Sequence, residues 1–361
     1  MSLFDLSSIE AAFMRAAVEP YLWRNAMDVV TSAFGGYGAG LFPIDGQFPG
    51  QPRTETLEPS FQSYFQNGWV ERDLRYRGIS IARRYGAYTD FDYISHEEMG
   101  RQPYYQEFLR PNGLKWFAGI GLDSPGDFWV LSIQRRGEQD PFTRAQVAEM
   151  AQLAKRLSSA LSIASAFAFT RAHAAAHAFQ YAGKAAILLD RRGQVVLMNE
   201  LAHKLCDGDL QIISKRLTSI DVNATRALNY ALHRLLWTKE TALSEAVVLP
   251  RQNRRPIIAY IGRLESSIDG ILDCQAIVSL HDLDARPKAN LDVLRHAFKL
   301  THAEARFAQA IGAGGTLQDA ADSVSITRET ARSRVKVIFA KTGARRQSEL
   351  VSLLHRLPFS E

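Results

Sequence analysis

The residues most suited to a specific chemistry are basic ones, gathered near the C-terminal end. The whole chain has 361 residues, with 43 Lys and Arg against 38 Asp and Glu. Residues outside 328–346 are almost balanced in charge, so the positive excess lies within that stretch. Such a patch is typical of a protein that binds a polyanion. Its only acid is Glu329, and its seven bases are Arg328, Arg332, Arg334, Lys336, Lys341, Arg345 and Arg346.

A second set of residues suits the binding of a small molecule. Tyr64 lies nine residues before Asp73, with Trp69 between them and Tyr88 further along. A few polar groups among aromatic side chains are what a ligand pocket requires, although the same four residues are also explained as ordinary core and surface residues. Further aromatic candidates of second rank are Tyr104, Tyr105, Trp116 and Phe117.

The basic stretch follows a pattern that predicts a helix-turn-helix unit. Thr301 with Glu304 forms a capping box for one helix, which ends at a glycine-rich segment, residues 312–315. Thr316 begins a short helix, and Thr327 caps a third. Ala331, Val335, Ile338 and Phe339 give this third helix its apolar face.

The opposite face of the third helix is predicted to enter the major groove of double-stranded DNA. At helical spacing, Arg332, Ser333 and Lys336 share this face, where such side chains hydrogen-bond to base edges. The residues better placed for phosphates, which fix register without reading sequence, are Arg328, Thr330, Arg334 and Lys341.

Several motifs in order over about sixty residues resemble the LuxR/GerE helix-turn-helix family of transcription regulators. The resemblance implies DNA binding, with a fourth helix that supports a dimer and matches Leu350, Val351, Leu353 and Leu354. Gln347 stands where the family usually has Arg. The matching segments are residues 300–306, 330–334, 341–344 and 349–351.

The Tyr64 and Asp73 spacing is similar to the autoinducer-binding domain of LuxR proteins. In that family the equivalent residues line a pocket for an acyl-homoserine lactone, which implies a ligand-binding role for Tyr64, Trp69, Asp73 and Tyr88 in quorum sensing. Ser60 replaces a family Trp, Leu74 replaces a Pro, and Tyr88 replaces a Trp. These changes favour a different small molecule, or none.

The elements that position these residues indicate a multidomain fold. Residues 1–142 are expected to form an α/β (PAS/GAF-like) sensor domain, and residues 143–177 a long connecting helix capped by Thr143 and Gln146. Apolar residues recur along this helix at alternating steps of three and four. This seam is expected either to pack on its own domain or to form a homodimer, the second being preferred; its members are Met150, Leu153, Leu157, Ala160, Ala164 and Phe167.

Residues 178–285 resemble a PAS domain. An apolar strand at 185–189 is followed by an Asp-x-x-Gly turn, a second strand at 195–198 and Asn199. The resemblance implies a second α/β PAS-like domain, whose remaining strands match runs at 246–249, 257–261 and 271–280. An all-α LuxR-type unit at residues 290–361 completes the predicted fold.

The chain is therefore expected to be a cytoplasmic, homodimeric transcription regulator that binds double-stranded DNA and responds to a small-molecule effector. No apolar run is long enough to span a membrane, and no motif indicates a metal, a cofactor or catalysis. Two alternatives stay open. The upstream domains either bind a protein partner instead of a small molecule, or form an enzyme that carries a DNA-binding module.

Overall fold

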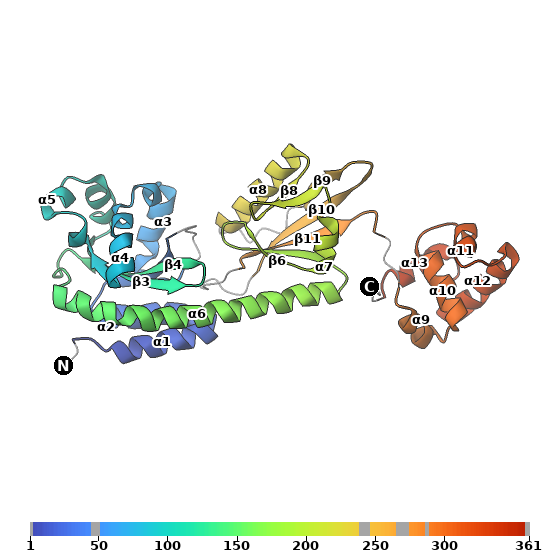
Figure 1. The fold of residues 1–361 in the computed structure, drawn as a ribbon, viewed down its shortest axis with the longest axis horizontal. Helices are drawn as coiled ribbons and strands as arrows, with labels where there is room; N and C mark the ends of the chain where they lie inside the picture. The colour runs from blue at the N-terminus through green and yellow to red at the C-terminus, as the bar shows by residue number, and fades with distance from the viewer. Residues whose placement is uncertain (1–2, 45–50, 238–245, 265–273, 286–288, 358–361) are drawn as a thin grey trace.

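A computed structural model describes residues 3–44, 51–237, 246–264, 274–285 and 289–357. Figure 1 shows three folded units in chain order along the long axis, with the first two joined by one long helix. Each unit has its own hydrophobic core. The strand predicted at 271–280 begins at Ala276, and residues 271–273 lie outside the described residues.

The N-terminal domain is built on a four-stranded antiparallel sheet in the order β1-β4-β3-β2. Alternate residues of each strand face opposite sides, so that Leu131 of β4 enters a core with the long helices while Ser132 faces the other side. The strands are β1 (Gly38–Pro43), β2 (Ala87–Thr89), β3 (Leu114–Ser124) and β4 (Asp127–Arg136).

Helices cover both faces of this sheet. On one face lie α1 (Leu6–Val18), α2 (Trp23–Ala33) and the first half of α6 (Arg144–Tyr181). The other face is covered by shorter helices and helical turns: η2 (Glu55–Leu57), α3 (Glu58–Gln66), η3 (Trp69–Arg72), η4 (Leu74–Gly78), α4 (Ile79–Tyr85), η5 (Asp90–Asp92), α5 (His96–Met99) and η6 (Tyr104–Leu109). One more turn, η1 (Pro20–Leu22), joins α1 to α2.

The apolar seam of α6 packs inside this chain, so the preferred expectation of a coiled-coil dimer through it is wrong. Leu153 and Leu157 are fully buried in the N-terminal core, whereas Phe167, at the end of the predicted seam, is 44% exposed. The cause is that α1 and β3 occupy the face that a partner helix would need. Farther along, Ala172 and Ala176 pack against Leu188 of the next domain. One rigid helix thus contributes to two cores.

The middle domain contains a five-stranded antiparallel sheet in the order β6-β5-β11-β10-β9. Helix α8 covers one face and the end of α6 covers the other. Asn199 caps α7 and also bonds to the backbone of β5. The elements are β5 (Ala185–Leu189), β6 (Val195–Met198), α7 (Glu200–Leu205), a hairpin of β7 (Leu210–Ile213) and β8 (Arg216–Ser219), α8 (Val222–Trp237), β9 (Ala246–Arg251), β10 (Arg254–Arg263) and β11 (Ala276–Asp282).

The C-terminal unit is all helical. Thr301 and Glu304 form the predicted capping box of α10, and Thr316 and Thr327 cap the next two helices. One helix that the sequence analysis did not identify, α9 (Leu291–Phe298), precedes them. The others are α10 (His302–Gly312), α11 (Leu317–Ser323), α12 (Arg328–Thr342) and α13 (Gln347–Leu354).

No helix in the described part of the chain, the 38-residue α6 included, combines the length and apolar character that crossing a membrane requires. Within the same residues, no three His, Cys, Asp or Glu side chains are grouped so that they could hold a metal ion.

Candidate ligand pocket and DNA-binding face

A cavity of about 100 Å³ lies on the face of the N-terminal sheet that is turned away from α6. Its floor is formed by β1, β3 and β4, and its walls by α3, η4 and η6. The lining is mainly aromatic and aliphatic, with a few polar side chains. The residues that line it include Phe42, Leu57, Ser60, Phe61, Tyr64, Asp73, Arg75, Tyr76, Ile79, Tyr88, Tyr104, Phe108, Leu109, Leu114, Phe117, Val130, Ser132 and Gln134.

Tyr64 and Asp73 meet in the wall of this cavity. The Tyr64 hydroxyl donates to Asp73 Oδ2 at 2.9 Å, and the Arg75 backbone N–H donates to Asp73 Oδ1 at 2.9 Å. The second bond makes Asp73 the cap of η4. Burial raises the pKa of the Asp73 carboxyl above its ordinary value, although the charge of Arg75 opposes the shift.

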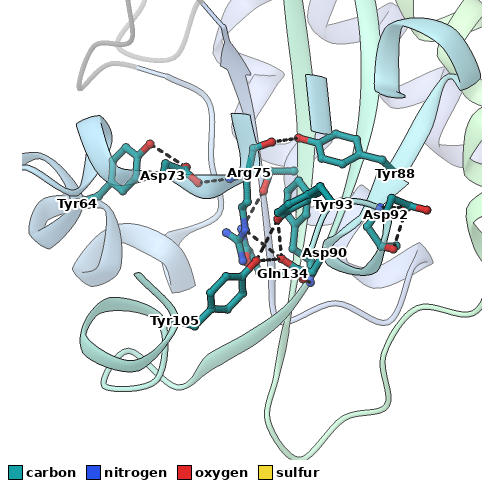
Figure 2. Close-up of polar contacts among 12 residues, drawn as sticks. Tyr64, Asp73, Arg75, Tyr88, Asp90, Asp92, Tyr93, Tyr105 and Gln134 are labelled. Carbon is teal, nitrogen blue, oxygen red and sulfur yellow. Dashed lines mark hydrogen bonds and ion pairs between the residues drawn. The ribbon is translucent and has the colours of Figure 1, made fainter. Parts of the chain in front are cut away.

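Tyr88 lines the same cavity and is held by close packing. A Cβ at Gly78 would lie 2.0 Å from the Tyr88 ring, and a Cβ at Gly119 would lie 2.6 Å from it. Only glycine at both positions leaves room for the ring. The Tyr88 hydroxyl donates to the backbone oxygen of Arg75 at 3.2 Å (Figure 2).

Trp69 is the one predicted pocket residue that does not line the cavity. Its indole is buried, but it stacks on Phe108 with 5.7 Å between ring centroids, and the Arg72 guanidinium lies 5.5 Å from it. Because Trp69 of η3 stacks on Phe108, which does line the cavity, it supports the wall without lining it. The structure therefore places three of the four predicted pocket residues in the lining of the cavity and Trp69 outside it.

Next to the cavity lies a buried polar cluster that the sequence analysis did not assign. Asp90, which is 1% exposed, accepts hydrogen bonds from the Tyr105 hydroxyl at 2.7 Å, the Tyr93 hydroxyl at 2.9 Å and the Phe117 backbone N–H at 2.8 Å. Arg75 Nε lies 3.7 Å from Asp90 Oδ1. Burial raises the pKa of the Asp90 carboxyl, and Arg75 opposes this shift. Figure 2 shows Arg75 between this cluster and the Tyr64–Asp73 pair.

Arg75 and Gln134 are the functional candidates that sequence reasoning missed. Both are buried, at 7% and 6% exposure, and both line the cavity. A usable signal existed for Gln134, because it follows a mainly apolar run on a central strand, where a polar side chain requires a partner. Arg75 gave no such signal, since a basic residue in a polar segment is usually exposed.

The second candidate site is the outer face of α12. Arg328, Thr330, Arg332, Ser333 and Lys336 are exposed, whereas Ala331 and Ile338 on the opposite side are fully buried in the core of the unit. The turn before α12 is tight, because the Ile326 backbone N–H donates to the Ala321 carbonyl at 3.0 Å. Val337, which the sequence analysis did not select, is 41% exposed on the same helix.

Two predicted phosphate contacts have other interactions within the chain. Lys341 Nζ forms an ion pair with Glu304 Oε2 at 2.7 Å and donates to the Lys299 carbonyl. The Arg334 guanidinium is half-buried and lies 5.9 Å from the Phe307 ring centroid. Both side chains therefore help to hold α12 against α10, and a phosphate would compete with these contacts.

No protein-family model matches the sequence, and no curated protein is significantly similar to it. Among solved structures, the phage VqmA–DPO complex is similar at 16% identity and a TM-score of 0.23, over 52% of this chain and 89% of that one. The DhaR(N)–DhaL complex of E. coli has 12% identity and a TM-score of 0.25, over 76% and 87%. A VqmA–ligand–DNA complex from Vibrio cholera has 17% identity and a TM-score of 0.19, over 48% of this chain and 82% of that one. These values are too low to assign a fold or a function.

Proposed function

We propose that this chain is a transcription regulator of the LuxR type, which binds double-stranded DNA through α12 and responds to a small molecule bound in the N-terminal domain. One observation carries the proposal. On α12, Arg328, Arg332 and Lys336 are exposed at helical spacing, while Ala331 and Ile338 are buried in a core shared with α10, α11 and α13. A helix anchored in this way presents its charges to the major groove as a fixed surface.

The exposed residues have distinct roles in this proposal. Arg332 and Lys336 donate to guanine O6 and N7, and Ser333 contacts a neighbouring base. Val337 offers an apolar surface for a thymine methyl group. Arg328, at the first turn of α12, contacts a phosphate and fixes the register of the helix on the duplex.

The N-terminal cavity supports the regulatory half of the proposal. It is lined by aromatic side chains with a few polar groups, which is the composition of ligand sites in general. The sheet that forms its floor also packs on α6, and α6 continues into the core of the middle domain. A ligand that favours one arrangement of this sheet would therefore bias the placement of α6.

The middle domain is assigned as PAS-like. Its opening has the strand, turn and strand order of the resemblance, and Asp190 Oδ1 accepts from the backbone N–H groups of Arg192 at 2.8 Å and Gln194 at 2.7 Å. In this proposal the domain transmits the state of α6 to the DNA-binding unit. Its role is regulatory rather than catalytic.

A homodimer on DNA remains part of the proposal, but the α6 seam is not available to form it. On α13, Leu350 and Leu354 are buried in the core of their own unit, so only Val351 and Leu353 of the four predicted residues are partly exposed. Sedimentation of the full chain with and without DNA distinguishes a dimer from a monomer. A monomer that protects one isolated half-site would contradict this part of the proposal.

DNA binding is tested with the full chain and a duplex selected from a random pool. The double variant Arg332→Ala, Lys336→Ala should lose selective binding, because both base contacts are removed. The matched control is Arg356→Ala, which removes an exposed charge of the same unit outside α12. Anisotropy titrations at several salt concentrations measure the effect. The proposal fails if the double variant selects and binds the duplex as the control does.

A further inference from the structure

Two buried polar groups at the N-terminal cavity have no hydrogen-bond partner. They are the Nη2 group of Arg75 and the Oε1 atom of Gln134. The Arg75 Nε group also makes no hydrogen bond, since its ion pair with Asp90 is 3.7 Å long. Both residues line the cavity and are more than nine-tenths buried. Leaving such groups unpaired is costly, so a molecule in the cavity that bonds to both would bind favourably.

The orientation of Arg75 limits how a ligand approaches it. The guanidinium lies 4.5 Å from the centroid of Phe117 and 5.6 Å from that of Tyr104, so aromatic rings cover its flat surface. Its N–H groups remain at the edge and point within the guanidinium plane. A ligand acceptor therefore has to meet Arg75 edge-on, in the manner of a carbonyl oxygen or a ring nitrogen.

Gln134 supplies the complementary group. Its Nε2 atom donates to Ser132 Oγ at 2.9 Å, which fixes the amide and leaves the carbonyl oxygen for a donor. Ser132 and Gln134 are on the same face of β4, two residues apart, and both line the cavity. The cavity thus offers one donor from Arg75 and one acceptor from Gln134.

The charge of the cavity disfavours an anion. Among the described residues, Arg75 is the one basic side chain that lines it, and two carboxyl groups, the half-buried Asp73 and the buried Asp90, lie on either side of that side chain. Asp90 already pairs with the Arg75 guanidinium, so an anionic ligand would have to share this cation with a neighbouring carboxyl group. A carboxylate or phosphate ligand would meet that competition in a medium that screens charge poorly. An uncharged ligand avoids this competition.

The size and shape of the cavity favour a small ring. A volume of about 100 Å³ is roughly three times the volume of about 30 Å³ that one water molecule takes up in the liquid. The aromatic side chains Phe61, Phe108 and Phe117 line it and provide flat surfaces for stacking. A single planar ring with a few substituents fits this space, whereas a long acyl chain exceeds it.

We infer that the cavity binds a small, flat, uncharged ring that carries a hydrogen-bond acceptor for Arg75 beside a donor for Gln134, as a cyclic amide does. This inference rests on the proposed function in one respect: that function makes the bound ring the effector that controls DNA binding. The recognition pair is Arg75 and Gln134, and the Tyr64–Asp73 pair forms the neighbouring wall.

Calorimetric titration of the full chain with α-pyridone tests this inference without DNA. α-Pyridone has a carbonyl beside an N–H group; N-methyl-α-pyridone lacks that donor, and benzoate is an anion of similar size. We expect saturable binding of α-pyridone in the millimolar range, about tenfold weaker binding of the methylated ring, and no binding of benzoate. Equal binding of the two rings, tighter binding of benzoate, or no saturable binding of α-pyridone would overturn the inference.

A variant gives an independent readout. Gln134→Met keeps the length of the side chain and removes its carbonyl, so it should weaken α-pyridone about tenfold and leave N-methyl-α-pyridone unchanged. Gln62→Met, an exposed position on α3 outside the cavity, is the matched control. If Gln134→Met does not fold, the comparison of the two rings on the unaltered chain still decides. If α-pyridone does not bind, the proposal that α12 binds DNA still stands. If the chain does not bind DNA, the expected result of the α-pyridone titration is the same.

Discussion

Arg191, in the turn between β5 and β6 of the middle domain, forms an ion pair with Asp127 at the start of β4 in the N-terminal domain. The two side chains are 7% and 15% exposed. Arg192 lies 3.4 Å from the other carboxylate oxygen, and the Arg191 guanidinium lies 5.1 Å from the Trp129 ring centroid. The pair therefore joins two domains at a point where both sheets end in a turn.

Removing this carboxylate should weaken the connection between the domains. Asp127→Asn removes the carboxylate that this ion pair offers to the largely buried Arg191, and we expect a loss of about 2 kcal/mol in the free energy of unfolding, between the values typical of exposed and buried pairs. Urea titration measures the change. Asp123→Asn, an exposed carboxylate at the end of β3 in the same hairpin, is the control. Equal effects of the two substitutions would show that the ion pair does not hold the domains together.

Base contacts and phosphate contacts on α12 should leave different signatures. Arg332→Ala should lose about 1–3 kcal/mol of discrimination at one base pair while affinity for unrelated DNA changes little. Arg328→Ala should weaken all sequences alike and lower the salt slope by roughly 1. Titrations on the selected duplex and its single-base variants separate the two. A uniform loss with Arg332→Ala would mean that α12 does not lie in the groove as proposed.

Lys341→Ala is expected to combine two effects, because Lys341 is paired with Glu304. The substitution should weaken DNA binding at every sequence, because a phosphate contact is lost. It should also lower the free energy of unfolding by at most about 1 kcal/mol, since the ion pair between α12 and α10 is partly exposed. Unfolding and DNA titration of the same preparation measure both. If Lys341→Ala weakens DNA binding but leaves the free energy of unfolding unchanged, Lys341 contacts a phosphate and its ion pair with Glu304 does not stabilise the fold.

The packing of Tyr88 predicts a sensitive glycine. Gly78→Ala would place a methyl group against the Tyr88 ring, and such overpacking costs about 1–3 kcal/mol in the free energy of unfolding. Displacing Tyr88 should also weaken ligand binding, since its ring lines the cavity. Gly137→Ala, whose Cβ would meet its nearest atom at 3.8 Å, is the control. A Gly78→Ala protein as stable as this control would contradict the packing described here.

The raised pKa of Asp73 predicts how stability depends on pH. Its pKa is raised above the ordinary 3.8, so between 3.8 and the raised value the folded chain holds a proton that the unfolded chain has lost. The contribution of Asp73 to stability is therefore fully present below 3.8 and decreases as pH rises through the folded-state pKa. Asp73→Asn has no such carboxyl, and its stability relative to the unaltered chain should increase with pH and then level off.

Urea titrations of both proteins from mildly acidic to neutral pH measure that difference. Asp123→Asn, which removes an exposed carboxyl group, serves again as the matched control. If the stability of Asp73→Asn relative to the unaltered chain falls as pH rises, the pKa of Asp73 is lowered and the assignment is wrong.

Local features of this fold were predictable from the sequence. The capping box of Thr301 and Glu304 and the exposed basic face of α12 depend on residues within one or two helical turns, so their spacing alone indicates them. The same holds for Thr143 at the start of α6. In each case the interacting groups are neighbours in the chain.

The tertiary structure decided which surfaces meet. An apolar seam on α6 shows that something packs against it, but its pattern is the same whether α1 and β3 of this chain or a second copy supply the partner. Likewise, Arg75 and Gln134 lie on separate elements, and only the folding of η4 over β4 makes them the unpaired groups of one cavity. Sequence periodicity records which side of an element is apolar. The identity of what covers it depends on contacts between distant residues, which only the folded chain specifies.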